Sequence, residues 1–133
     1  MTERILVVDD EEGIRSFIAG ALEGKGYTVT QAADGREAEA LLARGSFHLM
    51  LTDLRMPGLD GMELLCRTRE AVPEMEVIVL TAHGTVDTAM AAMRLGAFDY
   101  LTKPLSGPDE LRLVVSRALE RRRMRDAAAH LAE

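Results

Sequence analysis

Five polar residues stand in this sequence where short apolar runs end. Asp9 and Asp10 follow the first run, Asp53 follows the third, Thr81 closes the fourth and Lys103 follows the fifth. Carboxylates gathered in a partly dry cleft repel one another, so a cation has to compensate them. Their oxygens suit Mg²⁺, and a lysine adds a mobile positive charge beside a phosphate. The set therefore predicts a phosphoryl-transfer site that holds Mg²⁺.

Each of these residues also has an ordinary structural explanation. An aspartate before a helix can cap it, an aspartate in a turn is common, and a threonine often ends a strand. Taken singly, these explanations are the stronger ones. The prediction of a site therefore rests on the joint occurrence of all five residues at strand ends.

Apolar runs rich in β-branched residues alternate with stretches of helical spacing. The predicted strands are Ile5–Val8, Thr28–Gln31, His48–Thr52, Val77–Thr81 and Phe98–Thr102. The predicted helices are Glu12–Glu23, Gly35–Ala43, Gly61–Ala71, Val86–Leu95 and Pro108 to about Leu131. This alternation predicts an α/β fold, a parallel sheet with helices on both faces. The functional crevice of such a sheet lies beyond the carboxyl ends of its strands.

Two helix starts carry the spacing of a capping box. Asp60 stands three residues before Glu63, and Ser106 stands three residues before Asp109. In a capping box the first side chain accepts a hydrogen bond from the backbone N–H of the second residue. These signals agree with predicted helices that begin at Gly61 and Pro108.

Length and composition predict one globular domain. The chain has 133 residues, of which 47% are hydrophobic and 29% charged. A net charge of −6 argues against a nucleic-acid-binding surface. The one cysteine, Cys66, is expected to be buried on a helix face rather than reactive. The apolar runs are too short for a membrane span and no signal peptide is recognisable, so a cytoplasmic location is expected.

Four segments of the chain resemble the receiver domain of bacterial two-component response regulators. They are ILVVDDE (5–11), LMLTDLRMPGLDGMELL (49–65), VIVLTAHG (77–84) and GAFDYLTKP (96–104). The resemblance covers residues 1–120 and implies a flavodoxin-like (βα)5 fold with strand order 2-1-3-4-5. Residues 121–133 would then be a C-terminal helical extension, or a linker to an output domain.

The resemblance implies a role for each residue of the predicted site. Asp53 would be the nucleophile that takes a phosphoryl group from a sensor histidine kinase, and an ionised carboxylate needs no general base for that. Asp10, Asp53 and the backbone carbonyl of Arg55 would bind Mg²⁺, while Asp9 would hold a metal-bound water. Lys103 would pair with the phosphoryl group. The domain would catalyse only its own phosphorylation and slow dephosphorylation.

Two further residues are implied to act as a switch. Thr81 would donate its hydroxyl to the phosphoryl oxygen and draw the following loop inward, and Tyr100 would follow that movement. A tyrosine on a strand is explained equally well by half-buried packing. The helix Val86–Leu95 is rich in Ala and Met and has few large branched residues, so it is expected to repack at modest cost.

Some finer features come with the same resemblance. His83 and Arg55 would flank the phosphoryl group and tune the hydrolysis of the acyl phosphate. The peptide bond between Lys103 and Pro104 would be cis, although base rates alone favour trans.

The same residues argue against two other classes of phosphate-handling protein and leave a third open. The stretch 20–26 has one spacer too few for a P-loop and no hydroxyl after its lysine. A dehalogenase-type aspartyl-phosphate phosphatase would show D-x-D after the first strand, whereas this chain has adjacent acids there. A stand-alone receiver adaptor, never joined to an output domain, stays open.

The last predicted helix carries a basic stretch beyond Val114: Arg117, Arg121, Arg122, Arg123 and Arg125. A solvated basic face explains it, and so does a helical linker. The segments 80–104 and 110–123 resemble the receivers of NtrC-type activators, which work with the nitrogen-type sigma factor. That resemblance implies an attached transcription-activator output domain.

A homodimer is expected through the helix 86–95, the fifth strand and the last helix. Met90 and Met93 would supply an adaptable apolar patch with charged margins. Few apolar residues occupy heptad positions beyond Leu119, so a long coiled coil is not expected. The receiver itself is expected to make no direct contact with nucleic acid and none with a membrane.

Overall fold

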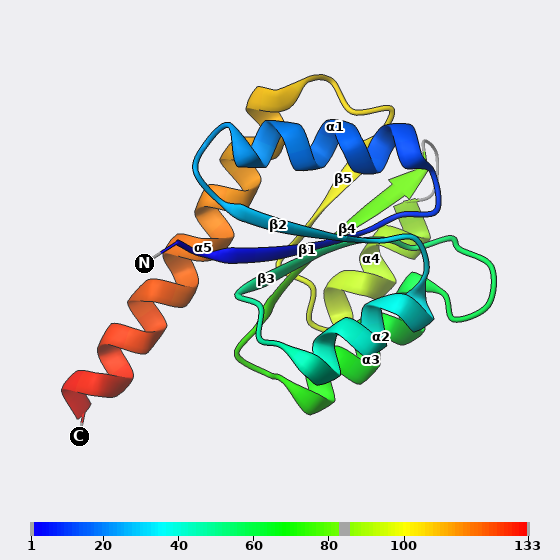
Figure 1. Ribbon diagram of the computed structural model, residues 1–133. Coiled ribbons are helices and arrows are strands. Elements are labelled where there is room, and N and C mark those ends of the chain that lie inside the picture. Colours follow the sequence, from blue (N-terminus) through cyan, green and yellow to red (C-terminus); the bar gives the residue numbers. More distant parts are fainter. Residues whose placement is uncertain (1, 83–85, 133) are drawn as a thin grey trace.

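The computed structural model describes residues 2–82 and 86–132, and within them five parallel strands form one sheet (Figure 1). The strands are β1 (Arg4–Val8), β2 (Thr28–Ala32), β3 (Leu49–Asp53), β4 (Glu76–Ala82) and β5 (Asp99–Lys103). The helices are α1 (Glu12–Glu23), α2 (Gly35–Arg44), α3 (Gly61–Ala71), α4 (Val86–Arg94) and α5 (Pro108–Ala132). The strand order is β2-β1-β3-β4-β5. The predicted α/β fold and strand order are confirmed.

Both faces of the sheet are covered by helices. On β1, the side chains of Ile5 and Val7 join a buried cluster with α1 and α5, while Leu6 and Val8 join a second cluster with α2, α3 and α4. Figure 1 shows the sheet between these two helical layers. Burial on both sides explains why the central strands are nearly continuous apolar runs rather than alternating ones.

The strand register brings the polar strand ends to one edge. Val8 pairs with Thr52, so the residues that follow, Asp9 and Asp53, lie level with each other. On the other side of β3, Asp53 pairs with Leu80, which precedes Thr81. The carboxyl ends of β1, β3 and β4 therefore open into one crevice, as the fold class predicts.

One of the two predicted helix caps is present and the other is wrong. The Asp60 carboxylate accepts a hydrogen bond from the Glu63 N–H at 2.9 Å and starts α3. α5 begins at Pro108, as predicted, but the Ser106 hydroxyl donates to the Glu110 carboxylate and is not the predicted cap. Proline suits the first helical position because its ring fixes φ and no N–H is needed there.

The expectation that Cys66 is buried is also wrong, because the cysteine is exposed. Leu64 and Leu65 fill the core-facing side of α3, and Thr68 continues that side one turn later. Each helical residue turns about 100° from the previous one, so the third residue of the run Leu64–Cys66 points to solvent.

Gly61 allows α3 to start directly against the end of β3. A Cβ at this position would lie 1.9 Å from the Asp53 carbonyl oxygen and 2.7 Å from the Leu54 Cα. We expect Gly61→Ala to destabilise the domain by about 2–3 kcal/mol, because backbone rather than a flexible side chain has to move. Urea denaturation measures the change.

A matched substitution on another helix separates crowding from helix propensity. Gly20 lies within α1, and a Cβ there meets no atom within 4 Å. Gly20→Ala should therefore stabilise the domain by up to about 1 kcal/mol. If both alanine variants shift stability in the same direction, the close approach at Gly61 does not constrain the fold.

No helix within residues 2–82 and 86–132 combines the length and apolar character needed to cross a bilayer.

Candidate functional site

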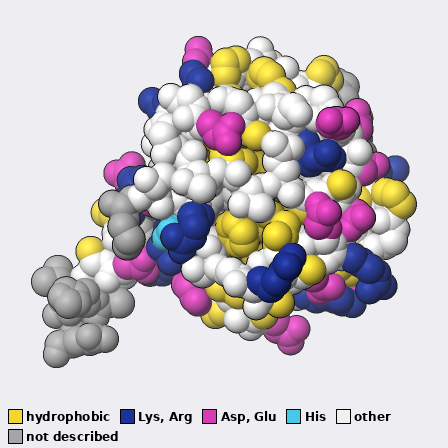
Figure 2. Space-filling model, viewed as in Figure 1, with side chains coloured by type: hydrophobic (Ala, Val, Ile, Leu, Met, Phe, Trp, Pro, Cys, Tyr) yellow, Lys and Arg dark blue, Asp and Glu magenta, His cyan; other side chains and the backbone are white. Residues whose placement is uncertain are grey.

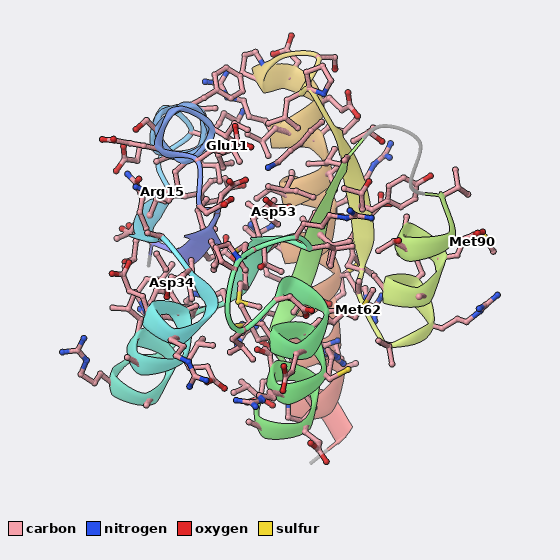
Figure 3. All side chains as sticks on the ribbon, turned by 90° about the vertical axis from the view of Figure 1, so that its right-hand side faces the viewer. Glu11, Arg15, Asp34, Asp53, Met62 and Met90 are labelled. Carbon is pink, nitrogen blue, oxygen red and sulfur yellow. The ribbon has the colours of Figure 1, made fainter. Side chains whose placement is uncertain are left out.

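A cavity of about 210 Å³ opens at the carboxyl edge of the sheet. It is lined by Asp10, Glu11, Asp53, Leu54, Arg55, Leu80, Thr81, Ala82, Thr88 and Lys103. In Figure 3, which looks at this edge, Asp53 lies at the end of its strand in the middle of the view and Glu11 lies at the start of α1. Acids, a lysine and a threonine from separate segments thus share one small space.

The Asp53 carboxylate is held through both of its oxygens. Oδ1 accepts a hydrogen bond from the Arg55 N–H at 3.2 Å, and Oδ2 accepts one from the Lys103 ammonium at 3.0 Å. The residue is only 6% exposed. Two partners on opposite oxygens fix the plane of the carboxylate at the cavity wall.

Asp9 lies behind this carboxylate and is fully buried. Its Oδ2 forms an ion pair with the Lys103 ammonium at 2.8 Å, and its Oδ1 accepts a hydrogen bond from the Glu11 N–H at 2.9 Å. The Arg15 guanidinium donates to the Asp9 backbone carbonyl at 2.8 Å. The turn between β1 and α1 is therefore fixed around the buried acid.

Three carboxylates gather around a single ammonium. Asp9, Asp10 and Asp53 each offer an oxygen, and these atoms lie within 4.8 Å of one another. Lys103 bonds to two of the three residues, so carboxylates outnumber it. An all-oxygen donor set with excess negative charge fits a divalent cation such as Mg²⁺.

Burial and charge shift two ionisable groups in the site. Burial raises the pKa of the Asp53 carboxyl above its usual value, although the Lys103 ammonium opposes that change. Burial acts to lower the pKa of Lys103, but the Asp9 and Asp53 carboxylates outweigh it and leave that pKa raised. Lys103 is therefore a permanent cation at neutral pH.

The structure brings most of the predicted site residues together. The Thr81 side chain, 4% exposed, lies on the cavity wall near Asp53 and Lys103. Tyr100 does not line the cavity; it is 43% exposed on β5, which is compatible with half-buried packing, and its switch role stays a prediction. The Lys103–Pro104 peptide is cis, as the resemblance implied. His83 lies outside the described residues.

Sequence reasoning assigned no role to three residues that belong to this site. Glu11 lies 3.5 Å from the Lys103 ammonium, Thr88 reaches the cavity from α4, and Arg15 holds the Asp9 carbonyl. Glu11 directly follows the two aspartates, and Arg15 stands four residues later on the same helical face. That spacing could have indicated Glu11 and Arg15, whereas no local signal marks Thr88.

A family model described as "Response regulator receiver domain" matches residues 5–116. The chain belongs to the response regulator receiver family. The receiver is 46% identical over 121 residues to the alginate biosynthesis transcriptional regulatory protein AlgB of Pseudomonas aeruginosa, which covers 91% of this chain and 27% of that protein. It is 43% identical over 115 residues to the DNA-binding transcriptional regulator NtrC of Salmonella typhimurium, covering 86% of this chain and 24% of that protein.

A solved structure of NtrX from Brucella abortus has the same fold. It superposes with a TM-score of 0.94 at 37% identity and covers 98% of this chain and 30% of that one. The receiver thus spans about a quarter of the length of the curated relatives it matches. The resemblance to receivers of NtrC-type activators is confirmed. Membership of the receiver family also argues against a dehalogenase-type phosphatase and a P-loop protein.

Proposed function

We propose that this receiver accepts a phosphoryl group on Asp53 from a sensor histidine kinase, in a Mg²⁺-dependent reaction. The observation that carries the proposal is the Asp53 carboxylate itself. It borders a cavity, its two oxygens are held by Arg55 and Lys103, and two more carboxylates adjoin it. A carboxylate oriented in this way needs no base, and electrostatic stabilisation supplies the catalysis.

The residues present would hold Mg²⁺ in a specific way. Asp10 and Asp53 would bind it directly together with the backbone carbonyl of Arg55, and Asp9 would hold a metal-bound water. The bound ion would neutralise the carboxylates and the oxygens of the transferring phosphoryl group. Asp10 is exposed whereas Asp9 is buried, which supports a direct role for Asp10 and an indirect one for Asp9.

The transfer conserves charge and atoms without a general base. An Asp53 oxygen bonds to phosphorus while the bond from phosphorus to the donor imidazole breaks, and the imidazole leaves with the electron pair. Lys103, already 3.0 Å from Asp53, would then pair with the new phosphoryl oxygens. Thr81, on the neighbouring strand, would donate its hydroxyl to the same group.

The switch is proposed to run from Thr81 to the surface formed by α4, β5 and α5. α4 is anchored by small residues, because its buried side chains are Ala89 and Ala92. Small anchors make repacking inexpensive, and Tyr100 on β5 is 43% exposed. A phosphoryl group can shift this equilibrium only through contacts that differ between the two states, and Thr81 and Lys103 would supply those contacts.

The output is proposed to be an attached transcription activator. Residues 1–120 would form the receiver and residues 121–133 the helical linker, and the longer length of the relatives supports an attached domain. Figure 2 shows basic and acidic side chains interspersed over the viewed face, without a broad basic surface for nucleic acid. Contact with DNA would then fall to the output domain.

Lys103→Ala should still accept phosphate but transmit little of it. In the native domain a small acyl phosphate with Mg²⁺ should label Asp53 and move the amide chemical shifts of Val86–Arg94. In the variant labelling should persist while those shifts hardly move, since the ammonium mainly responds to the phosphoryl group. Labelling and nuclear magnetic resonance spectra are measured on the same sample.

The one other lysine of the chain gives a matched control. Lys25 is exposed after the carboxyl end of α1, whereas the site residues Asp10 and Glu11 precede the start of that helix, so Lys25→Ala should label and shift like the native domain. Equal shifts in the Lys103 variant and the native domain would refute the transmitting role. An unlabelled native domain would refute the proposed function itself.

Phosphorylation should also change self-association through α4, β5 and α5. Met90, Met93, Leu95 and Leu113 leave this surface apolar, with side chains between 39% and 50% exposed, and Met90 projects outward from α4 in Figure 3. Such a patch suits an isologous dimer. Sedimentation of the full chain and of a chain ending at Leu119, each with and without a phosphoryl mimic, should show dimer fractions that differ among the four samples. Four samples that contain only monomer would contradict the dimer.

A further inference from the structure

Among the described side chains of α5, which reach Ala128, none beyond Leu119 belongs to the buried core. The core-facing stripe of α5 consists of Leu111, Val114, Val115, Ala118 and Leu119. The positions that continue this stripe, Arg122 and Arg125, are arginines. Figure 1 shows α5 running on past the sheet. Short helical segments without packing are marginal in water, so attachments of another kind have to hold this part.

Glu76 provides such an attachment at the amino end of β4. The residue is 1% exposed, and its Oε2 lies 3.4 Å from the Arg121 Nε and 3.3 Å from the Arg125 Nη1. The second Arg125 nitrogen donates to the Glu74 carbonyl at 2.7 Å. One buried carboxylate oxygen is thus shared by two guanidinium groups that stand four residues apart on α5.

Two further contacts come from other parts of the sheet. The Arg123 guanidinium pairs with the Glu3 carboxylate at 2.6 Å, just before β1. The Arg121 guanidinium lies 5.4 Å from the centre of the Phe98 ring, just before β5. The arginines therefore bridge α5 to the amino-terminal ends of three strands instead of forming a freely solvated basic face.

The Glu76 contacts are the buried part of this arrangement and also its loosest. A charge-assisted hydrogen bond usually measures about 2.7–2.9 Å, shorter than either guanidinium contact, and Oε2 has no hydrogen-bond partner among the described residues. A buried carboxylate without a cation is strongly unfavourable. The Glu76 carboxylate therefore needs the arginines of α5 to compensate its charge. Because both guanidinium contacts are longer than a usual charge-assisted hydrogen bond, these distances can still change.

We propose that Glu76 is the anchor of an electrostatic latch that holds residues 120–128 in one direction against the amino-terminal edge of the sheet. β4 carries Glu76 at one end and Thr81 at the other. A shift of β4 when Thr81 contacts a phosphoryl group would then move Glu76 and change the direction of residues 120–128 of α5. This regulatory use, unlike the latch itself, rests on the proposed function.

Amide hydrogen exchange of the full chain tests the latch without any phosphodonor. Glu76→Gln removes the charge but keeps the shape, and exchange over residues 120–128 should rise about ten-fold or more while β1 and β3 stay protected. Glu74→Gln is the matched control, because it removes an exposed charge two residues away and keeps the carbonyl that Arg125 uses. Equal exchange in the two variants overturns the latch.

A second pair of variants approaches from the helix. Arg125→Gln leaves Arg121 to compensate Glu76, so the domain should fold and lose protection only in the extension. Arg117→Gln is its control, since Arg117 is exposed and makes no ion pair with any described residue. Exchange that accelerates evenly over the whole domain in Arg125→Gln would indicate a general stability role and overturn the proposal.

A further hydrogen-exchange measurement tests whether phosphorylation acts on the latch. After a small acyl phosphate and Mg²⁺ are added, exchange over residues 120–128 should change in the native domain and stay constant in Glu76→Gln. Labelling of Asp53 is followed in the same samples. A labelled native domain with unchanged exchange overturns the regulatory use alone, whereas an unlabelled one counts against the proposed function.

Discussion

Asp53→Asn should reduce phosphorylation by a small acyl phosphate or a cognate kinase at least about 1000-fold, to background. Asparagine keeps the size of the side chain and one acceptor oxygen for the Arg55 N–H, so the loop after β3 should stay in place. What disappears is the anionic oxygen that attacks phosphorus. Mass spectrometry of the intact chain measures the bound phosphoryl group.

The structure explains why neighbouring acids should not take over. Asp9 is fully buried and its two oxygens are engaged by Lys103 and by the Glu11 N–H. Asp10 is exposed, and in the proposed function its oxygens bind the metal. Asp53 alone combines access to the cavity with partners that fix its plane.

A conservative control uses another aspartate of the same loop. Asp60→Asn keeps an oxygen that can cap α3, so labelling should match that of the native domain. The native label should be an acyl phosphate, released by mild base and by hydroxylamine. Undiminished or base-stable labelling of the Asp53 variant would contradict the assignment of the nucleophile.

Much of this site could be predicted because its residues lie at strand ends. The central strands are buried on both faces, so they stand out as apolar runs, and the first polar residue after each run marks the carboxyl edge. Asp9, Asp53 and Lys103 were found in this way, and the parallel register then brought them within hydrogen-bond distance. The apolar runs do not indicate to which side of the sheet each acidic side chain points.

Adjacent residues at the end of a strand point to opposite sides. The pair Asp9 and Asp10 follows this rule, with one side chain buried against Lys103 and the other exposed. The sequence alone does not say which of the two is buried, and only the resemblance assigned their roles. The Cys66 error has a related origin, because three adjacent apolar residues on a helix cannot all face the core.

The arginines of α5 show a different limit of sequence analysis. Their spacing indicated a basic face, but the acidic partners of Arg121, Arg123 and Arg125 are Glu3 and Glu76, which precede them by long stretches of chain. Glu76 follows a proline-containing loop and begins an apolar run, so nothing local marks it as an ion-pair partner. Such pairs depend on where β4 and α5 meet in space, and that follows only from the assembled fold.

Asp10→Ala, or withdrawal of Mg²⁺, should abolish phosphorylation while leaving the fold intact. Three carboxylates lie within 4.8 Å of one another around Lys103, so losing one relieves repulsion. The variant should be as stable as the native domain without metal, or more stable by up to about 1 kcal/mol. Labelling and thermal unfolding are measured with Mg²⁺ and with a chelator.

Metal binding should appear separately as a stability increment. A ligand at ten times its dissociation constant stabilises the folded state by about 1.4 kcal/mol, which is several degrees in the thermal midpoint for a domain of this size. We expect this increase in the native domain and its loss in Asp10→Ala. Asp109→Ala removes an exposed aspartate from the first turn of α5, so it should keep both the increase and the labelling.

These two measurements distinguish a metal ligand from a residue that merely supports the loop. If Asp10 only shaped the turn after β1, its removal would lower the thermal midpoint in chelator, and Mg²⁺ would still raise the midpoint of the variant. If Asp10 binds the metal, the thermal midpoint in chelator stays the same or rises and the response to Mg²⁺ disappears. The two direct protein ligands that remain, Asp53 and the Arg55 carbonyl, are too few to hold the ion. A native midpoint that does not respond to Mg²⁺ at all would contradict the metal site itself.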